Sequence, residues 1–245
     1  MWFAKIHSDF VEIFENDFSF IIYIKGCEGI YKAVEYIYLI DNSHLYCYMK
    51  NRFIYKKKLL SRDLTKILFD DAFYVSDEDN GTIYQYDLYG NIIRSKKLGQ
   101  HISDFEITDS FIYGAIYHEN KIIKCNMDDI IAELKLNNVP QNVIFVKNKF
   151  YILTNDQFFS YIYMTDCDLN LLKTNKFDRQ IGCIKNFNNK IVFCGTDIIY
   201  ILNEELHIIS QRKSTGKFLC EFGNVPIFEC GKKRLDIINN IIYPL

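Results

Sequence analysis

One turn signature recurs along this chain, and it constrains the fold more than any other feature. An Asp or Asn closes one strand-like run, and an apolar pair opens another a few residues later. The Asp or Asn recurs at intervals of 36 to 40 residues, at Asp87, Asn126, Asp166, Asn203 and Asn239. The apolar pairs are Ile92-Ile93, Ile130-Ile131, Leu171-Leu172, Ile208-Ile209 and Ile241-Ile242. Asp and Asn cap turns with their own side chains and tolerate left-handed backbone, so each copy predicts a β-hairpin.

A second hairpin is predicted between successive copies of the first. Its β-branched and aromatic runs are Phe73-Tyr74-Val75, Phe111-Ile112-Tyr113, Phe150-Tyr151-Ile152, Ile191-Val192-Phe193 and Ile227-Phe228. Such runs favour strands, and each follows a short polar turn and another apolar run, as at Lys66 to Phe69. Each unit of about 38 residues therefore has four antiparallel strands, called A to D in chain order.

A fixed period of four short strands favours a β-propeller, in which neighbouring units bury each other's faces. Nearly the whole chain resembles the broad class of repeat propellers that includes the NHL, YVTN and WD40 families. The Trp-Asp dipeptide of WD40 repeats is absent, and the single Trp is Trp2. The resemblance implies an all-β propeller of four-stranded antiparallel blades, and it assigns no functional residue.

The repeat predicts one domain over residues 1–245, with seven blades and six as the alternative. The approximate blades are 1–28, 29–63, 64–100, 101–138, 139–178, 179–214 and 215–245. The first copy is partial, because Phe10 to Ile13 aligns with a strand C and leaves room for strands B to D alone. How such a ring closes is left open.

Composition excludes several classes of function. The formal net charge is −2, so no strong field attracts phosphate backbones, and nucleic acid is not an expected partner. No apolar run reaches the length of a membrane helix, and Met1 to Lys5 lacks the pattern of a signal peptide. We expect a cytoplasmic protein that has no membrane partner. None of the eight cysteines forms a Cys-x-x-Cys pair, which favours reduced, buried thiols.

Basic residues gather in the predicted D strands, which form the outer edge of each blade. They are Lys56-Lys57-Lys58, Arg94, Lys96-Lys97, Lys173, Lys176 and Arg212-Lys213. Lys commonly protects an exposed strand edge from pairing with another chain. We interpret these residues as a solvated rim, with a patch for an anionic partner as the alternative.

The B–C and D–A connections lie on the same face of a propeller, and acids and histidines are predicted there. The candidate binding residues are Asp41, His44, Asp77, Asp79, His101, His118, Glu119, Asp156 and Asp197. Carboxylates and imidazoles in one ring suit a cationic partner or a divalent metal, but acids are also good turn formers. Asp77-x-Asp79-x-Gly81 matches the start of a calcium loop, but Leu88 replaces the bidentate Glu at its twelfth position.

No motif for a nucleophile, a phosphate loop or a zinc protease occurs in the sequence. No catalytic residue and no cofactor are therefore predicted, and a metal stays open. The predicted channel lining, at the starts of the A strands, is mixed and polar: Thr65-Lys66, Ser103-Asp104, Gln141-Asn142, Gly182-Cys183 and Lys217.

The sequence thus favours a non-enzymatic scaffold that binds a protein or peptide through one loop face. The alternative is an enzyme, a hydrolase or lactonase with a metal-assisted site at the channel mouth, which is an analogy from fold. Oligomeric state and ligand are not indicated.

Overall fold

A computed structural model describes most of the chain. The described residues are 2–15, 18–27, 29–33, 35–41, 43–60, 64–69, 72–108, 111–187, 189–195, 198–213, 218–222, 225–230, 233–236 and 241–244. Every regular element in these ranges is a β-strand. They contain no helix long and apolar enough to cross a membrane.

The strands form seven antiparallel sheets, one of three strands and six of four strands. We number them blades 1 to 7 in chain order. Blade 1 contains β1 (Trp2–Ile6), β2 (Phe10–Glu15) and β3 (Phe18–Tyr23). Blade 2 contains β4 (Gly29–Ala33), β5 (Tyr36–Ile40), β6 (His44–Met49) and β7 (Arg52–Lys58). Blade 3 contains β8 (Leu64–Phe69), β9 (Phe73–Asp77), β10 (Thr82–Tyr86) and β11 (Ile92–Lys97).

The remaining four blades have the same order of strands A, B, C and D. Blade 4 contains β12 (Ile102–Thr108), β13 (Phe111–Ile116), β14 (Lys121–Cys125) and β15 (Ile130–Lys135). Blade 5 contains β16 (Val139–Val146), β17 (Lys149–Asn155), β18 (Ser160–Thr165) and β19 (Leu171–Phe177). Blade 6 contains β20 (Ile181–Phe187), β21 (Lys190–Gly195), β22 (Ile198–Leu202) and β23 (Ile208–Lys213). Blade 7 contains β24 (Phe218–Phe222), β25 (Val225–Cys230), β26 (Lys233–Asp236) and β27 (Ile241–Pro244).

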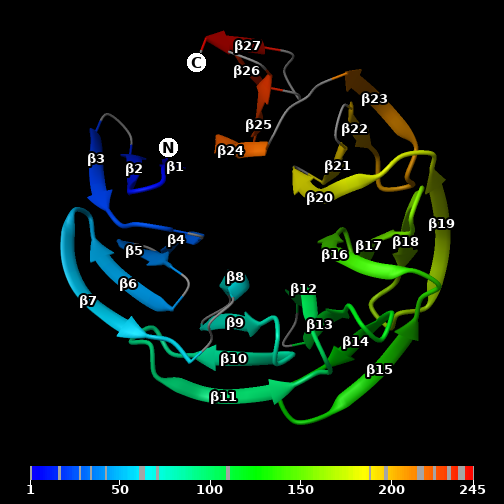
Figure 1. Ribbon diagram of the computed structural model, residues 1–245, viewed down its shortest axis with the longest axis horizontal. Helices are drawn as coiled ribbons and strands as arrows, with labels where there is room; N and C mark the ends of the chain where they lie inside the picture. Colours follow the sequence, from blue (N-terminus) through cyan, green and yellow to red (C-terminus); the bar gives the residue numbers. More distant parts are fainter. Residues whose placement is uncertain are drawn as a thin grey trace.

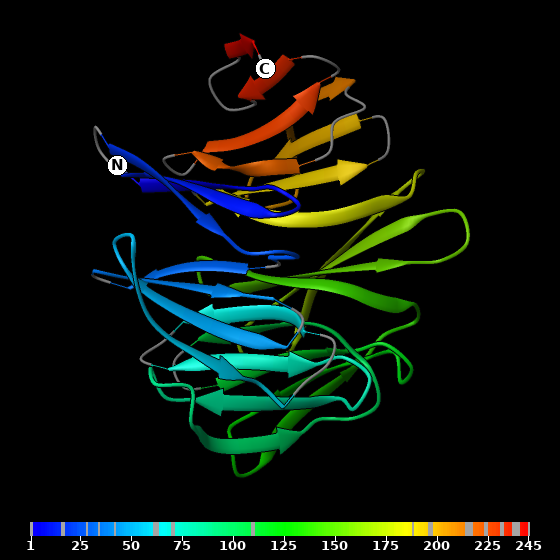
Figure 2. The same ribbon diagram turned by 60° about the vertical axis from the view of Figure 1, so that its left-hand side comes forward.

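The sheets stand around a common centre, with the A strands innermost and the D strands on the rim (Figure 1). Figure 2 shows the same sheets from another side, stacked face to face. The all-β architecture of four-stranded antiparallel blades is confirmed. Six complete blades fit the six-bladed alternative, and the partial first copy forms the separate three-stranded sheet.

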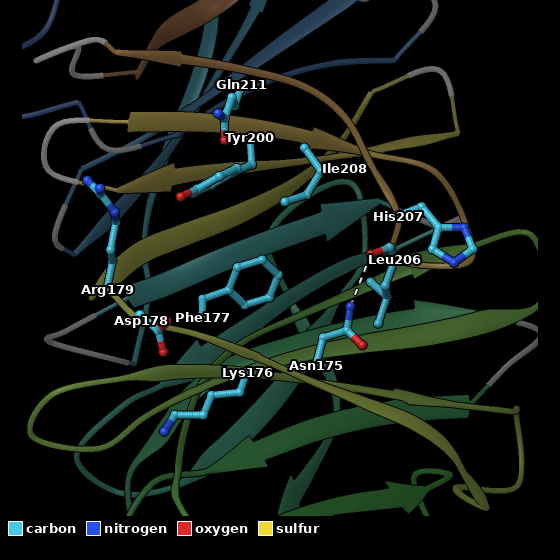
Figure 3. Close-up of a pocket in the computed structure, with 10 residues that line it drawn as sticks. All are labelled: Asn175, Lys176, Phe177, Asp178, Arg179, Tyr200, Leu206, His207, Ile208 and Gln211. Carbon is cyan, nitrogen blue, oxygen red and sulfur yellow. Dashed lines mark hydrogen bonds between the residues drawn. The ribbon is translucent and has the colours of Figure 1, made fainter.

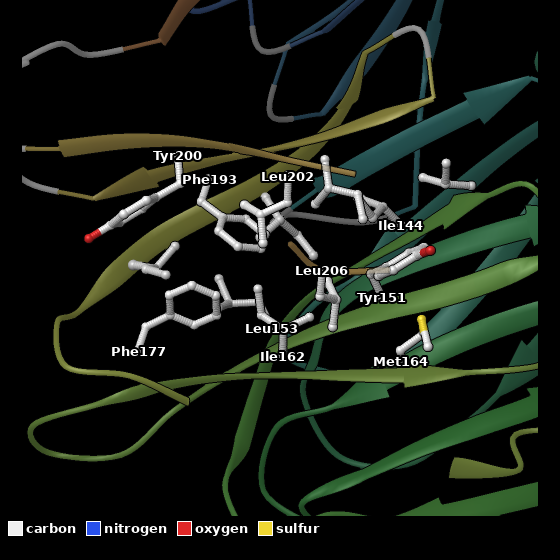
Figure 4. Close-up of a cluster of buried hydrophobic side chains, with 14 of the residues drawn as sticks. Ile144, Tyr151, Leu153, Ile162, Met164, Phe177, Phe193, Tyr200, Leu202 and Leu206 are labelled. Carbon is white, nitrogen blue, oxygen red and sulfur yellow. The ribbon is translucent and has the colours of Figure 1, made fainter. Parts of the chain in front are cut away.

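The hydrophobic core is divided among the spaces between neighbouring blades. The largest cluster lies between blades 5 and 6 and includes Tyr151, Leu153, Phe193 and Leu202, each fully buried (Figure 4). Because the middle strands pack against a blade on both sides, they are apolar on both faces, as in β22, which is buried throughout. Each blade therefore depends on its neighbours for burial, as the repeat predicts.

The predicted Asp and Asn residues cap the C–D turns. Asp87 Oδ1 accepts hydrogen bonds from the amides of Tyr89 at 2.9 Å and Asn91 at 2.8 Å. Asn126, Asp166 and Asn203 accept amide hydrogen bonds from their own turns in the same manner. Asn239 lies outside the described residues.

Basic side chains of the D strands connect neighbouring blades. Lys57 Nζ donates to Asn91 Oδ1 at 3.2 Å, in the next blade's C–D turn. Lys96 donates to the carbonyl of Asp128, and Lys173 donates to the carbonyl of Glu205 at 2.7 Å. These three lysines therefore bind the next blade in addition to lying on the rim.

The polar start of the A strand β12 also links two blades near the centre of the ring. Ser103 Oγ donates to the carbonyl of Pro140 at 2.7 Å. Asp104, which is buried, accepts a hydrogen bond from the amide of Val143 at 3.0 Å. Ser103 and Asp104 thus hold β12 against β16. Lys217 lies outside the described residues.

Candidate functional site

Two of the predicted acids organise the B–C turns in which they lie. Asp41 Oδ1 accepts hydrogen bonds from the amides of Ser43 at 2.9 Å and His44 at 2.7 Å. Its Oδ2 accepts from the hydroxyl of Tyr46 at 2.6 Å, and the ring of His44 lies 3.2 Å from Oδ1. Asp41 and His44 are therefore hydrogen-bonded to each other within a single turn.

Asp156 repeats this arrangement in blade 5. Its Oδ1 accepts from the amides of Phe158 and Phe159, both at 2.7 Å, and its Oδ2 accepts from the hydroxyl of Tyr161 at 3.0 Å. The two amides, aided by the Tyr161 hydroxyl, hold the pKa of Asp156 below its ordinary value. Burial alone would raise the pKa of Asp41, but hydrogen bonds from Tyr46 and two amides leave it lowered as well.

The carboxylate of Asp77 is also bound within its own turn. Asp77 is buried at the end of β9, and it accepts hydrogen bonds from the amide and the side chain of Asn80 at 3.0 Å and 2.7 Å. Asp79, two residues later, is exposed. The turn therefore directs one carboxylate inward and leaves the other at the surface.

The remaining predicted residues meet where blades 3 and 4 adjoin. Glu78 and Asp79 come from the B–C turn of blade 3, His101 from the connection between the blades, and Tyr117, His118 and Glu119 from the B–C turn of blade 4. We call these six residues the loop-face cluster. His101 Nε2 lies 2.9 Å from Glu78 Oε1.

Three rings of the loop-face cluster contact one another. The centroid of His101 lies 5.0 Å from that of Tyr117 and 5.1 Å from that of His118. Tyr117 and His118 are 5.2 Å apart, nearly perpendicular. The backbone of His101 has φ of 60°, in the left-handed region that side-chain-bearing residues rarely adopt. This conformation lets its carbonyl accept the amide of Tyr117 at 2.8 Å.

Carboxylates border these rings. Glu119 lies 2.9 Å from Lys121 Nζ, which holds the pKa of Glu119 below its ordinary value. Glu119 also accepts the amide of Gln100 at 3.3 Å. Glu78, Asp79 and Glu119 thus add three carboxylates to the turns that present the rings, and Lys121 pairs with Glu119. Aromatic faces and carboxylates both attract cations.

The structure brings together His101, His118 and Glu119, and Asp79 lies in the turn of Glu78, which contacts His101; Asp77 is buried at the start of that turn. It places Asp41 and His44 in blade 2, and Asp156 in blade 5. Asp197 lies outside the described residues. The predicted binding residues include neither Tyr117 nor Glu78, the partner of His101, although Glu78 belongs to the predicted acidic run Asp77-Glu78-Asp79. This run was the one available signal for Glu78.

No group of three or more His, Cys, Asp or Glu side chains in the described ranges is arranged to hold a metal ion. The carboxylates of Asp41, Asp77 and Asp156 accept hydrogen bonds from their own turns.

A hollow opens on the rim between blades 5 and 6, away from the loop-face cluster, with a volume of about 600 Å³. Phe177 and Tyr200 form its apolar base, with ring centroids 5.9 Å apart. The side chain of Asn175 crosses to the carbonyl of Leu206 at 3.0 Å and closes one end (Figure 3). We call this hollow the rim groove.

The chemistry of the rim groove is mixed. Arg179 and the hydroxyl of Tyr200 lie toward one end, and the ring of His207 lies at the other (Figure 3). Lys176 points away from the base and stacks over Phe159, with Nζ 3.4 Å from the ring centroid. The groove suits a small amphipathic group. Its residues come from separate parts of two blades, so no local pattern predicted it.

Comparisons with known proteins identify the fold. No protein-family model matches the chain, and the comparison with curated proteins gives no match. Virginiamycin B lyase from Staphylococcus aureus is 16% identical with a TM-score of 0.71, over 90% of this chain and 84% of that one. Hsv2 from Kluyveromyces lactis is 11% identical with a TM-score of 0.67, over 99% and 93%. This chain is a β-propeller.

A third similar propeller is BBS1N, whose structure was solved in complex with ARL6DN. It is 12% identical with a TM-score of 0.70, over 90% of this chain and 80% of that one. The solved structures similar to this propeller thus include a lyase and a protein bound to another protein. At these identities the similarity establishes the fold and leaves the function to the residues of this chain.

Proposed function

We propose that this propeller is a non-enzymatic protein that binds a basic segment of a partner protein at the loop-face cluster. The observation that carries the proposal is the contact between the rings of His101, Tyr117 and His118, bordered by Glu78, Asp79 and Glu119. A Lys or Arg side chain fits such a surface, because its stem packs on the rings and its charge pairs with the carboxylates.

Binding is favoured over metal-assisted hydrolysis because the carboxylates of Asp41, Asp77 and Asp156 already accept hydrogen bonds within their own turns. A hydrolytic metal needs several carboxylates or imidazoles with free lone pairs. Asp41 and Asp156 each accept two amides and a tyrosine hydroxyl, and Asp77 accepts both donors of Asn80. Of the cluster's acids, Asp79 is exposed, while Glu78 and Glu119 contact His101 and Lys121, so these carboxylates already take part in charge pairing at the surface.

The experiment is a selection of peptides from a random displayed library on the purified protein, followed by affinity measurement. We expect the selected peptides to be rich in Lys and Arg. The variant Glu78→Gln/Asp79→Asn/Glu119→Gln should bind them about tenfold more weakly, because each exposed charge pair contributes about 0.5 kcal/mol.

A matched control changes net charge equally on the opposite face. Asp128→Asn/Asp129→Asn/Glu205→Gln removes three acids from C–D turns, and it should leave the affinity within about twofold, since screening weakens distant charges. An equal loss of affinity in both variants would show that the peptides are attracted by the net charge of the protein alone. That result, or a selection without enriched peptides, would overturn the proposal.

A further inference from the structure

Among the described strands, three form blade 1 and none of them lies at the inner position. In blades 2 to 7 the first strand pairs antiparallel with the second and lies nearest the centre. In blade 1, β1 pairs with β2, and among the described strands it has no partner on its other side. The three strands present could be A to C or B to D, and their turns decide between these.

The turn between β1 and β2 is a B–C turn. The amide of His7 donates to the carbonyl of Phe10 at 2.9 Å. In blades 2 and 3 the residue after strand D donates to the B–C turn, Leu59 to Ser43 at 2.7 Å and Leu98 to Gly81 at 2.9 Å, and Ile24 after β3 donates to Asp9 at 3.1 Å in the same way. The strand β1 therefore occupies the B position, and the A position is the vacant one.

The vacancy leaves a strand edge at the inner side of the ring. Alternate residues of a strand direct their N–H and C=O groups to each side, so one set of these groups in β1 faces away from β2. Figure 1 shows no strand between β24 and β4 at the inner radius, with β1 farther out. Contact between β1 and β24 closes the ring without a shared strand.

We propose that an extended segment of a partner protein pairs with the inner edge of β1 and completes blade 1 as its fourth strand. Strand addition is an established mode of peptide recognition, in which main-chain hydrogen bonds provide affinity. The added strand would take over the contact with β24, as inner strands contact one another at β12 and β16 or at β16 and β20.

The other blades define what this segment is like. Their A strands are five to eight residues long and run antiparallel to strand B. In β12 the buried side chains are Ile102, Asp104 and Phe105. The expected segment is therefore a short strand former with apolar side chains for the space between blades and with free amides along its paired side.

The test uses β12 as the probe. A copy of residues 102–110, which contains β12 and the segment that leads to β13, is placed ahead of residue 1. The free peptide 102–108 is also added to the unmodified protein. Amide hydrogen exchange at residues 2–6 should slow at least tenfold in both cases. The melting temperature of the fusion should rise by about 2–4 °C. The same copy carrying Phe105→Pro, which removes an amide and distorts the strand, should lose both effects.

Unchanged exchange at residues 2–6 would overturn the proposal, as would slowing that persists with Phe105→Pro. A native dimer whose β1 amides are already protected would show a second copy at this edge, and it would also overturn the assignment to a partner. The binding of basic peptides to the loop-face cluster is measured separately, so failure of either experiment leaves the other interpretable.

Discussion

The carboxylate of Asp104 accepts a hydrogen bond from the backbone amide of Val143 at 3.0 Å, which joins the inner strands of blades 4 and 5. Asp104 is 5% exposed, so removal of the acceptor leaves a buried donor without a partner. We expect Asp104→Ala to cost about 2–3 kcal/mol of unfolding free energy, measured by urea denaturation. Asp129→Ala, on an exposed turn of blade 4, should cost less than about 0.5 kcal/mol. Similar losses for both would contradict this link.

A buried tyrosine makes a second connection between blades. The hydroxyl of Tyr151 donates to the carbonyl of Glu204 at 2.7 Å, from blade 5 to the C–D turn of blade 6. We expect Tyr151→Phe to lower the unfolding free energy by about 1 kcal/mol, because the ring stays and one buried bond is lost. Tyr89→Phe, at a ring that is 74% exposed, is the matched control and should have no measurable effect. An unchanged Tyr151→Phe protein would show that the bond adds nothing.

The turn cap at Asp41 predicts a dependence of stability on pH. Its pKa in the folded protein is lowered from 3.8, so its stabilising effect is present above about pH 4 and is lost as pH falls through the lowered value. The difference in melting temperature between the native protein and Asp41→Asn should therefore be largest near neutral pH and shrink toward pH 3. Asn126→Ala removes a cap that does not titrate, and its effect should stay constant. A constant difference for Asp41→Asn would contradict the role of its charge.

Buried thiols should resist alkylation. Burial raises the pKa of Cys125 to about 11, which leaves little thiolate at pH 8. With iodoacetamide at pH 8, mass spectrometry should find Cys125 unlabelled in the folded protein while the more accessible Cys167 reacts. Equal labelling rates would show that the space around Cys125 opens readily.

The blades could be predicted from sequence because the residues that stabilise each C–D turn lie within that turn. Asp87 caps its C–D turn through amides two and four residues away, so a local pattern carries the information. The apolar pairs could be recognised for the same reason, because each follows its turn by a few residues. These pairs are nevertheless about half exposed, between 44% and 56% in blades 3 to 6. Hydrophobicity alone would predict buried side chains there, and their exposure follows from the place of strand D at the outer edge of the blade.

The candidate site was predictable only in part, because it depends on which turns meet. The acids were found in the correct turns, but a B–C turn that binds its own carboxylate, as at Asp156, cannot be told in advance from one that exposes it, as at Asp79. The pairing of Glu78 with His101 links residues from two blades. Sequence spacing does not encode such a contact, and the rim groove was missed for the same reason.

The most direct test of the proposed function is hydrogen exchange of the propeller with and without a selected basic peptide. Protection should appear at residues 78–81, 99–102 and 117–120, where two neighbouring blades present the loop-face cluster, and it should vanish in Glu78→Gln/Asp79→Asn/Glu119→Gln. Protection confined to the rim strands or to the C–D turns, with these three segments unchanged, would contradict the account.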